Sequence, residues 1–253
     1  MIYGFLSGKG GVGKTALVAN IGCLISREKG KKVLLVDGNF TAPTLGLHFG
    51  VVPKEHTIID SLNGTIGIRD AIYTHASGVS ILPSSLSSES VCQDFSQLKA
   101  KLAEIKDGYD FILIDGASGI GKEALAAAEA SDGIFIISEA CLESAVAALR
   151  MVKTAAKAGV PIKGMVVNRV VRSRTDMTDK ELEELWGNQV VCDMPFDASI
   201  MEGFSNQQPA VLGKRSIKSL PSLRKLASAV SGEEPAKKES LLGRIMKIFR
   251  MSR

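Results

Sequence analysis

Ser7-Gly8-Lys9-Gly10-Gly11-Val12-Gly13-Lys14-Thr15 lies directly after the apolar run Ile2 to Leu6 and before residues 16–27, whose apolar side chains recur at helical spacing. A glycine, four further residues and then Gly-Lys-Thr is the spacing of a loop that wraps its backbone N–H groups around phosphates at a helix N-terminus. The segment therefore predicts a phosphate-binding loop between a strand and a helix.

Each residue type in this loop has a chemical reason to be there. Glycine lets the backbone approach phosphate oxygens without a Cβ clash. Lys14 is long enough to reach the β- and γ-phosphates, and the hydroxyl of Thr15 is a candidate ligand of Mg²⁺. A glycine-rich turn without a ligand is the much weaker alternative, because a strand and a helix flank the loop as the motif requires.

Lys9 is a second lysine inside the same loop. Residues 9–15, Lys-Gly-Gly-Val-Gly-Lys-Thr, resemble the deviant Walker A motif of the MinD/ParA family of dimerising ATPases, and within it the MinD-type septum-site and cell-division regulators. In that family the early lysine crosses to the nucleotide of a partner subunit. The resemblance implies an ATP-bound homodimer in which Lys9 neutralises charge on the partner's phosphates. A solvated surface lysine is the alternative.

Length and hydrophobic pattern predict one α/β domain. The chain has 253 residues, 45% of them apolar, which is enough for a sizeable core. Short continuous apolar runs, typical of parallel strands buried on both faces, alternate with helical stretches. Strands are predicted at 2–6, 33–36, 79–82, 111–114, 134–137, 165–167 and 189–192, and helices at 16–27, 122–130, 143–158, 179–186 and 217–230.

The resemblance specifies this class further. It implies a three-layer P-loop NTPase, with a mostly parallel central sheet flanked by helices, over residues 1–230. Within that domain, Thr178 and Glu181 have the spacing of a capping box, which predicts the start of the helix at 179–186.

Cysteine positions argue against a metal-binding class. Cys23, Cys92, Cys141 and Cys192 are scattered, without a Cys-x-x-Cys or Cys-x-Cys pair, as expected of reduced and mostly buried side chains. This counts against the iron–sulfur scaffold proteins and metal-insertion ATPases that share such a loop. The sequence contains no apolar run of about 18 residues and no charged leader before its first apolar run. We therefore expect a cytoplasmic protein.

Two aspartates come directly after predicted strands. Asp37 follows residues 33–36 and Asp115 follows residues 111–114. The carboxyl ends of parallel strands meet at one edge of the sheet, so both carboxylates are candidates for holding Mg²⁺ together with Thr15. Either aspartate alone is also compatible with capping a turn.

The segments that begin at these aspartates resemble the family's switches. Residues 37–46 resemble the first switch. Residues 115–120 resemble the second, although the usual proline is absent, which leaves that loop less constrained.

Two later segments resemble those that surround the base in the family. Val166-Val167-Asn168-Arg169 resembles the strand end whose asparagine reads the adenine edge, since an amide offers both an acceptor and donors. Met194-Pro195-Phe196-Asp197 and residues 205–209 resemble the loop that closes over the base. The resemblance covers Met1 to about Ala229 and implies ATP and Mg²⁺ as cofactors. The implied nucleotide contacts are Gly8, Lys9, Gly10, Gly11, Val12, Gly13, Lys14, Thr15, Ala16, Asn168, Arg169, Pro195, Phe196 and Asp197.

Asn39 departs from the family pattern. Relatives usually carry an aspartate there, thought to orient or polarise the attacking water, whereas an amide cannot accept a proton. We therefore expect slow basal hydrolysis from a catalytic set of Lys9, Lys14, Asp37, Asn39 and Asp115. A simple turn role for Asn39 has equal weight, and a protein that binds ATP without hydrolysing it is also left open.

The C-terminal segment differs in composition from the rest of the chain. Residues 231–239 are typical of a polar linker, and residues 240–253 have helical periodicity. Six large apolar residues fall on one side of that helix, and most of its Arg and Lys residues fall on the other. Such a basic amphipathic helix lies in the plane of an anionic bilayer, and it resembles the terminal membrane-targeting helix of MinD-type proteins. A last helix docked on the domain and a nucleic-acid tail are the weaker alternatives.

Net charge separates these alternatives. Residues 231–253 carry six Lys/Arg and three Glu, so +3 of the total charge of +4 belongs to this segment. The remaining domain is nearly neutral and lacks the basic footprint of a DNA-binding ATPase, so no specific nucleic acid is expected as a partner.

These features together favour a MinD-type ATPase that dimerises with ATP, associates reversibly with the membrane and acts in spatial regulation of the division site or a cell pole. The expected partners are a second copy, an anionic membrane surface contacted through Leu241 to Arg253, and a protein activator or cargo of unknown identity. The expected location is the cytoplasm and, peripherally, the inner face of the cell membrane. The alternative is a MinD-like assembly or maturation factor that places a surface organelle or loads a cofactor into a client enzyme.

Overall fold

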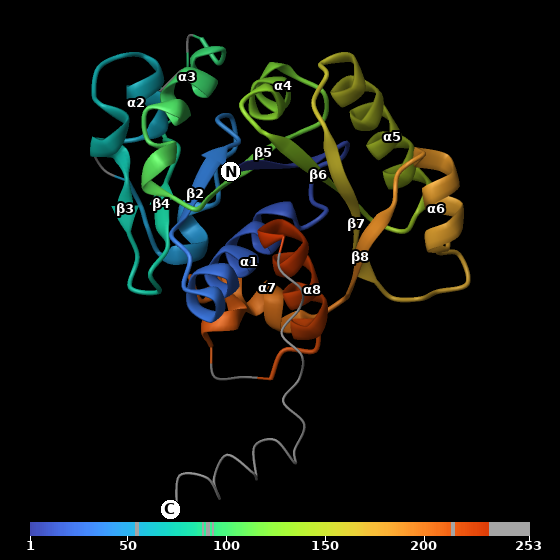
Figure 1. Cartoon of the computed structure of the whole chain (residues 1–253). Coiled ribbons are helices and arrows are strands. Elements are labelled where there is room, and N and C mark those ends of the chain that lie inside the picture. Colours follow the sequence, from blue (N-terminus) through green and yellow to red (C-terminus); the bar gives the residue numbers. More distant parts are fainter. Residues whose placement is uncertain (54–55, 88, 90–91, 93, 214–215, 233–253) are drawn as a thin grey trace, which may run out of the picture.

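A mostly parallel sheet runs through the centre of the molecule (Figure 1). The computed structural model describes residues 1–53, 56–87, 89, 92, 94–213 and 216–232. Within these residues the strand order is β3-β4-β2-β5-β1-β6-β7-β8, and only the short β3 runs antiparallel to its neighbour. The strands are β1 (Ile2–Ser7), β2 (Val33–Gly38), β3 (Tyr73–Thr74), β4 (Ser80–Leu82), β5 (Phe111–Ser118), β6 (Gly133–Ser138), β7 (Ile162–Val170) and β8 (Val190–Pro195).

Helices cover both faces of this sheet (Figure 1). One face carries α1 (Lys14–Lys29), α7 (Ala198–Ser205) and α8 (Leu220–Ser231). The other face carries α2 (Ile58–Leu62), α3 (Gln97–Ala103), α4 (Lys122–Glu129), α5 (Leu142–Lys157) and α6 (Asp179–Trp186). Short 3₁₀ turns complete the connections at η1 (Gly46–Phe49), η2 (Ile68–Ala71), η3 (Lys106–Gly108) and η4 (Ala210–Leu212).

Continuous apolar runs form the central strands because both faces of the sheet are covered. Nearly every residue of β1, β2, β5 and β6 is buried. Successive side chains point to opposite faces, so Phe5 stacks on Phe135 in one core while Leu6 and Ile136 pack in the other. The predicted fold, a three-layer α/β domain with a mostly parallel sheet, is confirmed.

Several element boundaries differ from those predicted. The helix predicted at 217–230 begins at Leu220, because Pro221 occupies the first turn, where its missing N–H costs nothing. β2 and β5 continue past their apolar runs to Gly38 and Ser118, so Asp37 and Asp115 lie inside strands rather than after them.

The C-terminal predictions fall largely outside the described residues. α8 ends at Ser231, and Gly232 follows with a left-handed φ of 67°, the conformation that glycine supplies at a helix end. The rest of the predicted linker and the whole predicted helix at 240–253 lie outside the described residues.

α6 shows how local sequence and packing agree. The Thr178 hydroxyl accepts from the Glu181 amide at 3.3 Å, and the Glu181 carboxylate accepts from the Thr178 amide at 2.8 Å, so the predicted capping box is confirmed. Leu182 and Trp186 are buried against the sheet layer. The indole N–H of Trp186 donates to the carbonyl of Ala145 in α5 at 2.9 Å, which ties the two helices together.

Removing this cap should destabilise the protein measurably. Thr178→Ala should lower the free energy of unfolding by about 0.5–2 kcal/mol, because it leaves the Glu181 amide in the first turn without its side-chain acceptor. Urea denaturation followed by circular dichroism measures the change. Thr154→Ala is the matched control, since the Thr154 hydroxyl only bonds back to the Arg150 carbonyl within α5. Equal losses in both variants would show that the cap contributes nothing specific.

Candidate nucleotide site

The phosphate loop connects β1 to α1 and needs glycine for two different reasons. A Cβ on Gly8 would lie 2.0 Å from the carbonyl oxygen of Ala147 in α5, so only glycine allows this close packing. Gly13 has a left-handed φ of 85°, and a Cβ there would lie 2.5 Å from Nδ2 of Asn168. The loop is therefore fixed between α5 and the end of β7.

A cavity of about 360 Å³ opens beside this loop. Among the predicted residues, its lining includes Gly11 to Ala16, Asn39 and Arg169. Ser7, Ala42, Thr44 and Ser118 belong to the loop and switch segments recognised in the sequence, whereas four further lining residues were not predicted, namely His48, Ile200, Met201 and Phe204. The cavity thus combines a polar floor of backbone amides with an apolar wall from α7.

Lys14 lies at the base of the cavity in a buried ion pair. Its ammonium donates to Asp115 Oδ1 at 2.9 Å, and the two side chains are 6% and 1% exposed. Among the described residues, the second oxygen, Asp115 Oδ2, has no hydrogen-bond partner. A buried carboxylate oxygen of this kind is suited to a cation or an ordered water.

Asp37 lies beside Asp115 because the two residues are register partners in neighbouring strands. Its carboxylate accepts from the amides of Asn39 at 3.2 Å and Leu45 at 2.9 Å. Burial and the nearby Asp115 carboxylate nevertheless raise the pKa of Asp37 to about 8. Two buried carboxylates with one ammonium form an environment that a divalent cation would stabilise.

These residues fit Mg²⁺. Thr15 lines the same cavity and supplies a hydroxyl oxygen, and all three predicted metal residues, Thr15, Asp37 and Asp115, carry the oxygen donors that Mg²⁺ prefers. Within the described part of the chain no cluster of three His, Cys, Asp or Glu side chains is close enough to hold a metal. The remaining ligands therefore have to come from phosphates and water, which is the usual way in which Mg²⁺ is bound.

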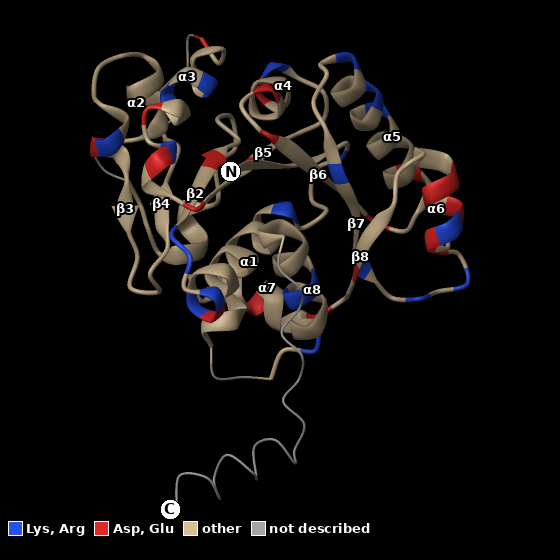
Figure 2. Cartoon of the chain, in the orientation of Figure 1, with Lys and Arg blue, Asp and Glu red and all other residues tan. Residues whose placement is uncertain are grey.

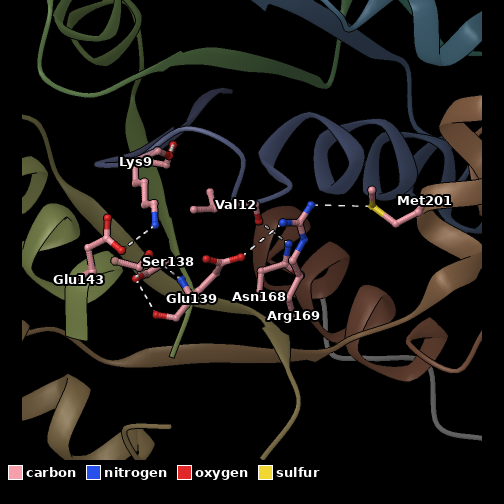
Figure 3. A network of polar contacts seen from close by, with 10 residues as sticks. Lys9, Val12, Ser138, Glu139, Glu143, Asn168, Arg169 and Met201 are labelled. Atoms are coloured by element: carbon pink, nitrogen blue, oxygen red, sulfur yellow. Dashed lines mark hydrogen bonds and ion pairs between the residues drawn. The ribbon is translucent and has the colours of Figure 1, made fainter. Parts of the chain in front are cut away.

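Lys9 points away from this cavity. Its ammonium donates to Oε2 of Glu143 at 3.0 Å, as Figure 3 shows, and of the two loop lysines only Lys14 lines the cavity. Glu143, in the first turn of α5, is 77% exposed and Lys9 is 37% exposed. The hydrogen bond to Glu143 is the main cause of a raised pKa at Lys9. Lys9 is therefore a charged group at the surface beside the site.

The predicted base-binding residues surround a second, narrower pocket. Asn168, Arg169, Pro195, Phe196 and Asp197 line it, but its volume is only about 30 Å³, enough for water and too small for a purine. Adenine can enter here only if side chains move, and its contacts with these residues stay a prediction.

Arg169 and Met201 line both cavities and so lie between them. Arg169 has a left-handed φ of 57°, unusual for a residue with a side chain. Its guanidinium donates to Glu139 Oε1 at 3.3 Å and to Met201 Sδ at 3.8 Å (Figure 3). The neighbouring Asn168 donates to the carbonyl of Val12 at 2.7 Å, so one of its amide hydrogens already serves the phosphate loop.

Asp197 has a positional role in this structure. Its carboxylate accepts from the amide of Ser199, which caps α7, and from the amide and hydroxyl of Ser219, just before α8. The residue therefore fixes α7 relative to α8. Residues 205–209, expected to belong to a loop over the base, start with the last residue of α7, and it is the helix that lines the cavity.

Asn39 occupies a turn and also faces the cavity. Its side-chain amide donates to the carbonyl of Ala42 at 2.7 Å, as the turn interpretation requires. Asn39 nevertheless lines the large cavity, as the kinetic interpretation requires. The geometry is compatible with both.

His48 is the clearest of the unpredicted lining residues. It comes from η1, and the centroid of its ring lies 4.6 Å from that of Phe204 in α7, so two lining residues from distant elements contact each other. Burial lowers the pKa of His48 to about 4, which leaves the imidazole neutral at pH 7. No local motif marks His48, because its neighbour in the structure is far away in the sequence.

Comparisons with known proteins agree with this site. The profile of a family described as AAA domain matches residues 2–158. An uncharacterised ATP-binding protein of Methanocaldococcus jannaschii is 32% identical over an alignment of 260 residues, which covers 99% of this chain and 98% of the relative. The cell division ATPase MinD of Pyrococcus furiosus has a TM-score of 0.86 at 32% identity, covering 91% of this chain and 98% of that one.

MinD of Pyrococcus horikoshii, solved as a complex with Mg-ADP, has a TM-score of 0.85 at 32% identity and covers 90% of this chain and 95% of its own. These likenesses extend over nearly all of the described residues. The chain therefore belongs to the MinD/ParA family of P-loop ATPases, and its cofactors are ATP and Mg²⁺.

Proposed function

We propose that this protein is a MinD-type ATPase that dimerises when it binds ATP, associates reversibly with the inner face of the cell membrane and acts in spatial regulation. The observation that carries the proposal is the placement of Lys9. Its ammonium lies outside the cavity and pairs with an exposed carboxylate, so it is available to a nucleotide held by a second subunit. Otherwise the protein resides in the cytoplasm.

The side chains of one subunit would prepare the phosphates for hydrolysis. Lys14 is held by Asp115 at the base of the cavity, where its charge offsets that of the phosphates. Thr15 and Asp37, with Asp115, would hold Mg²⁺, which supplies Lewis-acid neutralisation of phosphate charge. Lys9 of the second subunit would add a further positive charge, as an arginine finger does.

The membrane part of the proposal rests on the sequence of residues 240–253. None of the helices in the described part of the chain combines the length and apolarity needed to cross a bilayer. One short amphipathic anchor binds only marginally, whereas a dimer presents two, and the second contact becomes intramolecular. ATP-dependent dimerisation would thereby raise membrane avidity by about 10²–10⁴.

Charge on the described domain is consistent with a membrane anchor confined to the C-terminal segment. Basic and acidic residues occur next to one another, as on α6, and on helices of both layers (Figure 2). With +3 of the net +4 in residues 231–253, the domain offers little attraction to an anionic surface. Binding to an anionic membrane should therefore depend mainly on the terminal segment.

Substitution of Lys9 should weaken dimerisation, whereas substitution of Lys14 should weaken nucleotide binding. Lys9→Ala should bind nucleotide like the parent yet dimerise more than about tenfold more weakly, because a charge facing the partner's phosphates is lost. Lys14→Ala should weaken nucleotide binding itself by about 10–100-fold. Sedimentation velocity with a non-hydrolysable ATP analogue measures dimerisation, and Lys153→Ala on the exposed side of α5 is the control. A Lys9→Ala protein that dimerises like the parent would contradict the trans role.

Removing Leu241 to Arg253 should abolish co-sedimentation with anionic vesicles and leave nucleotide binding intact. Phe249→Glu should have nearly the same effect, because it places a charge on the acyl side. Ser240→Glu is the matched control: nine residues at 100° each place the same charge opposite Phe249. Equal vesicle binding with and without the segment would remove membrane association from the proposal.

Asn39→Asp should accelerate ATP hydrolysis in single-turnover experiments. A carboxylate that acts as general base contributes about 10²–10⁴ in rate, and less if it only orients the water. Asn39→Ala is the control for the turn role of Asn39. It loses the bond to the Ala42 carbonyl, as Asn39→Asp does, but adds no carboxylate. Equal rates for the parent and Asn39→Asp, at equal ATP affinity, would show that Asn39 is a turn residue.

A further inference from the structure

The loop after β2 forms one side of the cavity, and two carboxylates hold it. Asp37, inside β2, holds both ends of the loop through the amides of Asn39 and Leu45. A second carboxylate, that of Glu123, reaches the middle of the loop from α4. Asn39 and Thr44 from this loop line the cavity, so its position affects the nucleotide site.

Glu123 makes three hydrogen bonds to two adjacent residues. Its Oε2 accepts from the amides of Phe40 at 3.0 Å and Thr41 at 3.4 Å, and its Oε1 accepts from the Thr41 hydroxyl. Hydrogen bonds to an ionised carboxylate are stronger than neutral ones. This set of bonds uses both oxygens and therefore fixes the orientation of the loop as well as its distance from α4.

Packing reinforces the same attachment. Phe40 is only 7% exposed, and its ring stacks on that of Phe95, with centroids 5.3 Å apart and ring planes within 8°. Residues 40 and 41 are thus held by an aromatic contact on one side and by Glu123 on the other. Asn39 lies directly before them, so its place in the cavity depends on this attachment.

Only one of the two carboxylates that hold the loop is also a predicted metal ligand. Asp37 is a predicted ligand of Mg²⁺, so its oxygens have to serve both the loop amides and the cation or its waters. Glu123 does not line the cavity. Its bonds to the loop are therefore independent of the metal.

We infer that Glu123 is a positioning residue that holds residues 39–41 against α4 and thereby fixes the first switch segment beside the phosphates. The inference rests on the proposed ATP hydrolysis, because a loop lining the cavity influences the rate only through the reacting phosphates. Displacing such a group by about 1 Å can cost about 10²-fold in rate.

Glu123 also lies in the first turn of α4, where a negative charge stabilises a helix N-terminus. Two substitutions separate this effect from positioning. Glu123→Ala removes both. Glu123→Gln removes the charge but keeps an oxygen for the two amides and an N–H for the Thr41 hydroxyl. Glu129→Ala, at the exposed last position of the same helix, is the control for loss of a glutamate.

Hydrogen exchange of backbone amides in the full-length protein without nucleotide tests the attachment directly. In Glu123→Ala, the amides of Phe40 and Thr41 should exchange at least about tenfold faster, because their acceptor is lost. The Leu45 amide, bonded to Asp37, should keep its rate. Glu129→Ala should match the parent, and Glu123→Gln should exchange much more slowly than Glu123→Ala, because it keeps acceptors for both amides although without the charge. Unchanged exchange in Glu123→Ala, or equal acceleration in Glu123→Gln, would overturn the inference.

Single-turnover hydrolysis with Mg-ATP tests the consequence. Glu123→Ala should hydrolyse ATP about 10–100-fold more slowly at unchanged ATP affinity, and Glu123→Gln should recover most of the rate. A parent-like rate in Glu123→Ala would overturn the positioning role. A parent that does not hydrolyse ATP at all would contradict the proposed function, and the exchange rates would still decide whether Glu123 holds the loop.

Discussion

The buried ion pair between Lys14 and Asp115 is the interaction on which the nucleotide site depends. It joins the start of α1 to β5, and both side chains are almost fully buried. Removing one partner of such a pair typically costs about 3–5 kcal/mol, because it leaves an uncompensated charge in a low dielectric. Asp37 is the register partner of Asp115, and its pKa is raised first by burial and then by the Asp115 carboxylate. The site is therefore an electrostatic unit assembled from the phosphate loop and two neighbouring strands.

Much of the fold was predictable because its signals are local. Apolar runs such as 33–36 and 134–137 identify strands buried on both faces, and the capping box at Thr178 identifies the start of α6. α7 was missed since Gly203 is its only buried residue, so no periodic apolar face marks it. The ends of β2 and β5 were missed because these strands continue beyond their apolar runs. Pairing between the two strands includes Asp37 and Asp115, which are not apolar.

The site was predictable where its chemistry lies within a few consecutive residues. The phosphate loop was identified from its spacing and the two aspartates from their position after apolar runs, and Asp115 contacts both Lys14 of the loop and the neighbouring Asp37 strand. The partners that hold these groups could not be predicted from the sequence. Glu143 lies 134 positions from Lys9, and Glu123 lies 83 positions from Phe40. No sequence pattern brings such carboxylates to a loop, because the register of the sheet and the packing of α4 and α5 decide where they lie.

The hydrogen bond between Trp186 and Ala145 has a spectroscopic consequence. The chain contains one tryptophan, so its indole emission originates from a single buried position between α5 and α6. Ala145 is two residues after Glu143, the partner of Lys9. Any displacement of α5 that accompanies release of Lys9 would change the surroundings of that indole. The molecule thus carries an intrinsic fluorophore attached to the helix beside its proposed subunit contact.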